Sequence, residues 1–200
     1  MCVKNPQLIS PNIWKIKTAF TNSYLIKCNH GYLLVDTGYP NQFSHFRKKL
    51  AEIGVSPTDI KHLFLTHHHD DHSGFAKELL AESGATCIVH KNAIPYLQQG
   101  CPEETGQPVN RAVSFIFKIF TLFHKNFAFP AFSLRKNDVL IQEDDNEFLK
   151  SIGIDGIILS TPGHTDDSIS LLLSDGKAFV GNLAMNFMKF CMIGHRPIYV

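Results

Sequence analysis

The stretch Thr66-His-His-His-Asp-Asp-His-Ser-Gly74 decides how the rest of this 200-residue chain is interpreted. It contains four of the chain's 11 histidines, together with two aspartates. The apolar run Leu63-Phe64-Leu65 precedes it and is typical of a buried strand. His72 follows where we expect the chain to bend into a helix. A buried strand therefore leads into a short loop that is dense in polar side chains.

The spacing within this loop favours a metal site. Residues two apart in an extended segment point to the same side of the chain. His67, His69 and Asp71 therefore share one face, whereas His68 and Asp70 point away from it. Three imidazoles, counting the one at the helix start, then converge with one carboxylate, a ligand set that suits a borderline-soft divalent ion such as zinc. No cysteine lies nearby, which argues against a finger-type structural site.

Composition narrows the class of protein. A formal net charge of +1 offers no basic stripe, so we expect no nucleic-acid partner. The five cysteines include no C-x-x-C pair, which indicates reduced thiols and a cytoplasmic location. Lys4, Pro6 and Pro11 stand where a signal peptide needs an unbroken apolar core. We expect residues 1–200 to form a single domain.

Strand and helix patterns alternate along the chain, which predicts an α/β domain. The first part of the chain predicts paired strands at 13–26 and 32–35, a helix at 43–53, a strand at 60–66, a helix at 75–81 and a strand at 86–89. The last part predicts strands at 138–141 and 156–160 and a hairpin formed by 169–173 and 177–180.

Residues 92–136 interrupt that alternation and are interpreted as an insert. Prolines and glycines break its first part, and a phenylalanine-rich run at 113–132 follows. Lys118 interrupts this run before it reaches the ~20 apolar residues that a transmembrane helix needs, so no transmembrane segment is expected. One interpretation is that the aromatic side chains pack on the core. The others are a lid over the site, a homodimer face or a membrane-surface contact.

A second histidine loop follows the predicted strand at 156–160. It reads Thr161-Pro-Gly-His-Thr165 and repeats the arrangement of a buried strand that ends in a histidine. Together with Asp36-Thr37-Gly38 and the H-x-H-x-D-H pattern of 67–72, it makes the chain resemble the metallo-β-lactamase-fold superfamily of metal-dependent hydrolases. The resemblance extends over about 13–182. It implies a four-layer αβ/βα sandwich of the metallo-β-lactamase type, with a phenylalanine-rich helical insert and with the last strand-helix unit either absent or beyond the chain.

The resemblance also implies a ligand set. By this likeness His67, His69 and His164 hold a first metal ion, and Asp71 and His72 belong to a second site. The implied cofactor is Zn²⁺, with Mn²⁺ or Fe²⁺ as alternatives.

Two departures from the family pattern bear on the second ion. Asn182 stands where the family has a bridging aspartate, and a neutral amide oxygen attracts a cation less strongly than a carboxylate. It is therefore expected to be a weak ligand or none. His195 comes too soon after it to be the family's last histidine ligand. We predict one tightly bound ion and a second that is weak or absent.

The chemistry expected of such a centre is hydrolysis by a metal-bound hydroxide of an ester, thioester, lactone, amide or phosphoester bond. Asp71 is the predicted catalytic residue, because it can orient the attacking water and, if it does not bind a metal ion, accept its proton. Asp36 or Asp70 could fix a histidine tautomer from behind, whereas Asp167 is expected in a turn or facing solvent. The partner is a small-molecule substrate, apolar if the insert covers the site. The alternative is a catalytically degenerate member of the same fold that binds metal or regulates.

Overall fold

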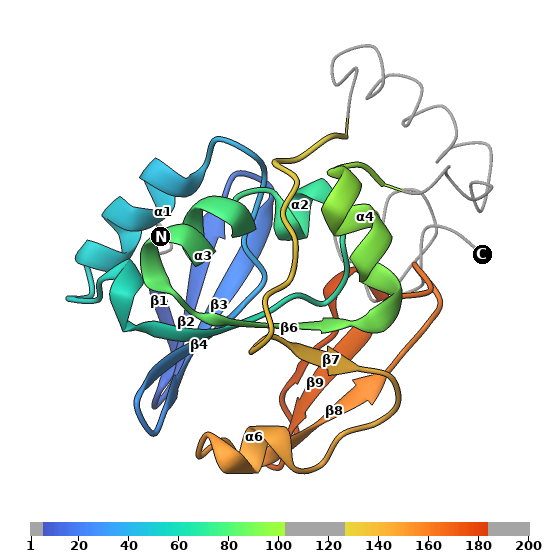
Figure 1. The fold of residues 1–200 in the computed structure, drawn as a ribbon. Helices are drawn as coiled ribbons and strands as arrows, with labels where there is room; N and C mark the ends of the chain where they lie inside the picture. The colour runs from blue at the N-terminus through green and yellow to red at the C-terminus, as the bar shows by residue number, and fades with distance from the viewer. Residues whose placement is uncertain (1–5, 103–126, 184–200) are drawn as a thin grey trace, which may run out of the picture.

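The computed structural model describes residues 6–102 and 127–183, and its strands form two sheets (Figure 1). The larger sheet consists, in spatial order, of β1 (Gln7–Ser10), β2 (Ile13–Thr18), β3 (Thr21–Cys28), β4 (Gly31–Val35), β5 (Ile60–Phe64), β6 (Thr86–His90) and β7 (Val139–Ile141). The smaller sheet consists of β10 (Ala178–Phe179), β9 (Ile169–Leu173) and β8 (Gly156–Ser160), in that order. The predicted α/β class is confirmed.

The larger sheet has an antiparallel half, whose strands are joined by short turns, and a parallel half, whose strands are joined by helical crossovers. Strands β1 to β4 pair antiparallel, whereas β4 to β7 pair parallel. A parallel pair needs a long connection, and helices lie in those connections. The helices are α1 (Phe43–Ala51), α2 (Asp70–Ser73), α3 (Ala76–Ser83), α4 (Ile94–Gln99) and α6 (Phe148–Ser151), with 3-10 turns η1 (Pro57–Asp59), η2 (Lys91–Ala93) and η3 (Gly181–Leu183).

The parallel strands end at one edge of the sheet, and this positions the site. Val35 pairs in register with Phe64, and Phe64 with Ile88. The segments that follow these residues therefore leave the sheet side by side. Asp36 and Thr66 are thereby brought close together at the carboxyl edge, where polar side chains can meet outside the core.

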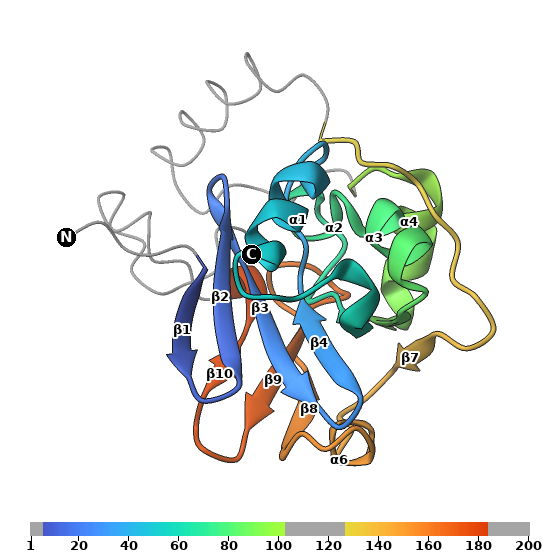
Figure 2. The same ribbon diagram turned by 90° about the vertical axis from the view of Figure 1, so that its left-hand side faces the viewer.

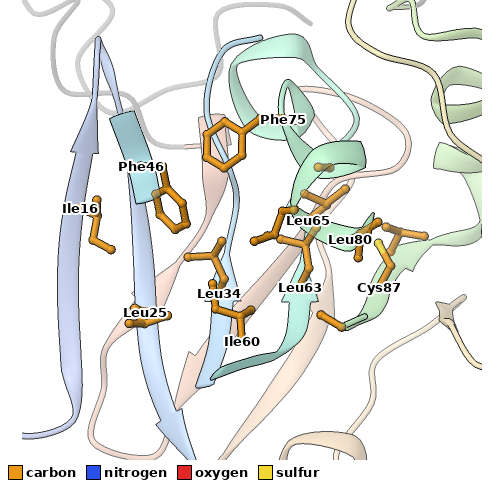
Figure 3. Close-up of a cluster of buried hydrophobic side chains, with 14 of the residues drawn as sticks. Ile16, Leu25, Leu34, Phe46, Ile60, Leu63, Leu65, Phe75, Leu80 and Cys87 are labelled. Atoms are coloured by element: carbon orange, nitrogen blue, oxygen red, sulfur yellow. The ribbon is translucent and has the colours of Figure 1, made fainter. Parts of the chain in front are cut away.

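Two hydrophobic cores lie on opposite faces of the larger sheet. Alternation along β4 and β5 fills both, because Leu34 and Leu63 point to the helical side while Leu33 and Phe64 point to the smaller sheet. Figures 1 and 2 show α1, α3 and α4 on one side of the larger sheet, with β8 and β9 on the other. The described residues thus form three of the four layers expected. Figure 3 shows the helical-side core, in which Ile16, Leu25, Leu34, Phe46, Ile60, Leu63, Leu65, Phe75, Leu80 and Cys87 are labelled.

Most predicted elements are present, but one prediction was wrong. The segment 13–26, predicted as one continuous strand, is the hairpin of β2 and β3, in which Thr18 pairs with Thr21. Its two-residue loop is Ala19-Phe20, and Ala19 has a φ of 52°. The turn was missed because it contains none of the Gly, Asn or Asp residues that usually mark such a loop. The short elements β1, α4 and α6 were not predicted, and α4 includes Pro95 in its first turn, where a proline is tolerated.

The described ends of the predicted insert pack on the domain. Phe129 N–H donates to the carbonyl of Gly100 at 2.9 Å, and Phe132 N–H to that of Leu97 at 2.9 Å. Phe129 is 6% exposed and Phe132 packs against the helical-side core, which confirms the core-packing interpretation for these two side chains. The run Val113 to Phe123, with the lid, dimer and membrane-surface hypotheses attached to it, lies outside the described residues. Within 6–102 and 127–183, no helix is long and apolar enough to span a bilayer.

Candidate metal centre

The two histidine loops meet at the carboxyl edge of β5. His67 and His69 lie in the loop between β5 and α2, His72 lies on α2, and His164 lies in the loop between β8 and β9. The loops are tied together at their bases, because Ile169 N–H donates to the carbonyl of Thr66 at 2.8 Å. This backbone hydrogen bond thus holds the two histidine loops facing each other, independently of their side chains.

Three imidazoles form the first cluster. The candidate ligand atoms of His67, His69 and His164 all lie within 4.8 Å of one another. Nδ1 of His69 is 3.1 Å from Nε2 of His164. The ring of His67 lies 4.7 Å from that of His69 and 4.9 Å from that of His164, measured between centroids. The sequence prediction grouped these residues, and the structure brings them together.

A second cluster shares His67 with the first. The candidate ligand atoms of His67, Asp71 and His72 also lie within 4.8 Å of one another. Nε2 of His72 is 3.3 Å from Oδ2 of Asp71. The rings of His67 and His72 are 4.2 Å apart at their centroids. The arrangement offers two neighbouring cation positions around one shared imidazole.

Asp36 supports the second cluster from behind. Its carboxylate accepts hydrogen bonds from Thr66 N–H at 2.7 Å, Thr66 Oγ1 at 2.8 Å and Nδ1 of His72 at 2.7 Å. Its φ of 57° is a left-handed conformation that aspartate adopts more readily than most residues. Because Nδ1 of His72 donates to Asp36, its Nε2 remains directed toward Asp71 and His67. Asp36 thus fixes a histidine tautomer, one of the supporting roles that the sequence analysis considered.

The electrostatic environment shifts the pKa values of four groups at the centre in different directions. The groups are His67, Asp70, Asp71 and His72. Burial and the neighbouring imidazoles hold the pKa of His67 well below its ordinary value. Burial would raise the pKa of Asp71, but His72 outweighs it, so the pKa is low. Burial would lower the pKa of His72, but Asp71 and Asp36 outweigh it and raise that pKa. Burial and then Asp71 raise the pKa of Asp70 to about 7. A neutral His67 and an anionic Asp71 are the forms that bind cations.

Asp167 lies in the expected turn, but the alternative that it faces solvent was wrong. It is 1% exposed, and its carboxylate accepts from the backbone N–H of His68 at 2.9 Å and from Nδ1 of His68 at 2.9 Å. The ring of His68 also stacks on Tyr96 of α4, with 4.2 Å between centroids and 17° between planes. The sequence held a signal for this pairing. A histidine that points away from the metal face into a buried layer needs a polar partner.

Asn182 reaches the first cluster. It lies in η3, with Nδ2 at 3.4 Å from Nε2 of His164. Gly181 permits this approach, because a Cβ there would lie 2.5 Å from Oγ1 of Thr66. His195 lies outside the described residues.

The residues of both clusters fit a divalent metal ion. Nε2 of His67 is buried and has no hydrogen-bond partner among the residues that the structure describes. A buried nitrogen of this kind costs free energy unless something binds it. Imidazoles with one nearby carboxylate match the ligands that zinc prefers.

Facing sheets with a histidine-rich centre at the carboxyl edge of the parallel strands define the class as a metal-binding α/β sandwich. The family model described as the metallo-β-lactamase superfamily matches residues 17–180. The chain therefore belongs to the metallo-β-lactamase superfamily, a superfamily of metallo-hydrolases, and its fold is the one that the sequence resemblance implied.

Known relatives are distant. The chain is 24% identical over 157 residues to "Probable metallo-hydrolase YflN" of Bacillus subtilis, covering 78% of this chain and 56% of that protein. It is 26% identical over 174 residues to "Beta-lactamase-like protein 2 homolog" of Caenorhabditis elegans, covering 87% of this chain and 45% of that protein. The chain thus spans about half the length of the curated relatives it matches.

Solved structures agree with the fold. BJP-1, a subclass B3 metallo-β-lactamase of Bradyrhizobium japonicum, aligns with a TM-score of 0.67 and 25% identity, covering 99% of this chain and 69% of that one. A β-lactamase from Chitinophaga pinensis aligns with a TM-score of 0.67 and 20% identity, covering 98% of this chain and 69% of that one. The second likeness bears on the fold alone.

Proposed function

We propose that this chain acts as a metal-dependent hydrolase. In this proposal His67, His69 and His164 hold the principal divalent ion, zinc, with Mn²⁺ or Fe²⁺ as alternatives. The observation that carries the proposal is the 3.1 Å approach of Nδ1 of His69 to Nε2 of His164, two residues 95 positions apart. Two neutral imidazoles at this distance can share a hydrogen bond, and the same two nitrogens can bind one cation. The buried Nε2 of His67, which has no hydrogen-bond partner among the described residues, favours the cation.

When bound at such a centre, zinc lowers the pKa of a coordinated water to about 7 and polarises the oxygen on which charge develops. The chain's own residues supply the rest. Asp71 is the proposed catalytic residue, because its anionic carboxylate can orient the attacking water. Where it does not hold the second ion, it can also accept the proton of that water. Asp36 keeps His72 in one tautomer beside it. The proposed substrates are esters, thioesters, lactones, amides or phosphoesters, and the proposed location is the cytoplasm.

The second ion position is proposed to be weak. Asp71 and His72 would hold that ion together with the shared His67. Asn182 contributes a neutral amide at the place where the family pattern has a carboxylate, so it balances none of the second cation's charge. We therefore expect one equivalent of tightly bound metal per chain, measured by mass spectrometry of the purified protein. Two tightly held equivalents would contradict this stoichiometry.

Turnover of a panel of generic substrates tests the hydrolase proposal. The panel contains an ester, a thioester, a lactone, an amide and a phosphodiester, each assayed with added zinc or manganese. His69→Ala should abolish turnover. His45→Ala is the matched control, because His45 is exposed and lies on α1 away from the centre. Turnover that survives His69→Ala, or that requires no metal, would exclude the mechanism.

A second candidate function is a degenerate member that binds metal without turnover, and Asn182 is the observation that favours it. Its amide stands 3.4 Å from Nε2 of His164, within the first cluster. Asn182→Asp separates the two functions. If the wild type is inert on the whole panel and Asn182→Asp gains turnover together with a second metal equivalent, the binding function is the correct one.

A further inference from the structure

The buried pair of His68 and Asp167 lies behind the metal centre and has no part in the ligand set. Both side chains are 1% exposed. The pair joins chain segments 99 residues apart through two hydrogen bonds, one to the backbone N–H and one to the ring of His68. A carboxylate that accepts two hydrogen bonds in the protein interior resists displacement, since charge-assisted hydrogen bonds are short and strong in a buried environment.

The pair of His68 and Asp167 lies where it can control the distance between the two histidine loops. His68 stands between His67 and His69 in the chain, and its ring lies 4.9 Å from that of His69 between centroids, with 80° between planes. Asp167 lies three positions after His164 on the opposing loop. A change in the separation of His68 and Asp167 therefore changes the separation of the two histidine-bearing loops.

A third element holds His68 in place. Tyr96 of α4 stacks on its ring. Asn92, just before α4, donates from Nδ2 to the backbone carbonyl of Asp166 at 3.3 Å, so the same segment also contacts the loop of His164. The base of the insert therefore contacts both loops behind the centre.

We propose that His68 and Asp167 are positioning residues that set the distance between His69 and His164 and so determine metal affinity. This inference rests on the proposed function, in which those two histidines hold the principal ion. Supporting residues of this kind typically change metal affinity about 10–100-fold when they are replaced. Neither side chain contacts the reacting atoms in this proposal.

Asp167→Asn is the direct test. An asparagine keeps the size of the side chain but offers only one acceptor oxygen, so its amide nitrogen would face one of the two His68 donors. Zinc affinity is measured by competition with a chromophoric chelator, and the ligand geometry by the visible absorption of the cobalt-substituted protein. We expect zinc affinity to fall about 10–100-fold and the cobalt bands to shift.

Asp138→Asn is the matched control. Asp138 is also a buried carboxylate, 2% exposed at its side chain, and it accepts a backbone hydrogen bond, from Cys87 at 2.8 Å. It lies at the start of β7, away from the centre. We expect this variant to lose thermal stability in its metal-free form while its zinc affinity stays within about twofold of the wild type.

Tyr96→Leu provides a second variant in case Asp167→Asn does not fold. It leaves both hydrogen bonds of His68 in place and removes the stacking partner, and we expect a fall in zinc affinity of up to tenfold. If the folded variants of Asp167 and Tyr96 bind zinc as the wild type does, the positioning role is wrong, even where their metal-free stability falls. A wild type that binds zinc but hydrolyses nothing would contradict the proposed function and leave this inference standing.

Discussion

Nδ1 of His72 lies 2.7 Å from Oδ2 of Asp36, across 36 residues of sequence, and the contact joins α2 to the end of β4. The same carboxylate accepts from the backbone and hydroxyl of Thr66, the first residue of the histidine loop. One side chain at the end of β4 therefore orients both the start of the loop and the histidine at its far end. The parallel pairing of β4 with β5 makes this contact possible.

Asp36→Asn should weaken metal binding without unfolding the chain. Asparagine tolerates the left-handed φ of 57° as aspartate does, so little backbone strain is expected. The loss of the negative charge beside His72 should lower affinity for the ion at the second cluster about 10–100-fold. Isothermal titration calorimetry with the metal ion measures this affinity in the wild type and in the variant.

Asp36→Ala is the companion variant, since alanine loses the hydrogen bonds and also adopts the left-handed conformation poorly. It should therefore destabilise the metal-free protein more than Asp36→Asn does. Equal metal affinity in wild type and Asp36→Asn would show that the carboxylate does not support the centre.

Gly74→Ala should disrupt the loop by steric overlap. A Cβ at Gly74 would lie 2.3 Å from the carbonyl oxygen of Asp70, 2.3 Å from that of Gly38 and 2.4 Å from the backbone nitrogen of Pro40. These are backbone atoms, so the neighbours cannot move away cheaply. We expect a loss of about 1–3 kcal/mol in the free energy of unfolding, as for other overpacked sites, measured by urea denaturation.

Gly163→Ala is the control for that substitution. It lies beside His164, but within the part of the chain that the structure describes a Cβ there would meet only Leu183 Cδ1, at an ordinary 3.5 Å. Its stability should stay close to that of the wild type. If both alanine variants were equally stable, the close packing around Gly74 would not matter to the fold.

Metal removal should lower thermal stability in the wild type and leave His69→Ala almost unaffected. A ligand that binds only the folded state at 100 times its Kd adds about 2.7 kcal/mol to the free energy of unfolding. In a chain of this size that corresponds to a shift of roughly 5–11 °C in Tm, at about 2–4 °C per kcal/mol. Thermal melts with added zinc and with excess chelator measure the difference. An unchanged melting temperature on chelation of the wild type would count against a metal centre.

The sequence predicted the ligands of the first histidine loop because their evidence is local. The period of two from His67 to Asp71 and the strand before it define a face of the loop without knowledge of the fold. The proximity of His164 came from the family resemblance, since no periodicity links positions that far apart.

What the sequence did not predict depends on long-range packing. Asp167 lies in a turn, as expected, but only the assembled sandwich shows that it is buried against His68. The hairpin at Ala19-Phe20 was missed because its loop contains none of the residues that usually mark a turn. Only the pairing of Thr18 with Thr21 shows where the chain reverses. Core packing of the insert was one of several interpretations that the sequence left open, and the long-range hydrogen bond of Phe129 N–H to the carbonyl of Gly100 is a contact that no local pattern indicates.

Asp138 should make part of the chain's stability depend on pH. Burial would raise the pKa of Asp138, but hydrogen bonds from Arg135 and Cys87 outweigh it, so the pKa in the folded state lies below its ordinary value. A group whose folded pKa is depressed stabilises the fold above its unfolded pKa of about 3.9, and this stabilisation disappears as the pH falls through the folded pKa.

Asp138→Asn should therefore cost about 1–3 kcal/mol of unfolding free energy near neutral pH, and the difference from the wild type should shrink below about pH 4. Urea denaturation at a series of pH values, with chelator present to remove the metal contribution, measures this gap. Asp175→Asn is the control, because Asp175 is exposed and its ion pair with Lys177 is screened by solvent. A gap between wild type and Asp138→Asn that stays constant from neutral pH to pH 3 would show that the charge of Asp138 contributes nothing, and that only the shape of its side chain supports β7.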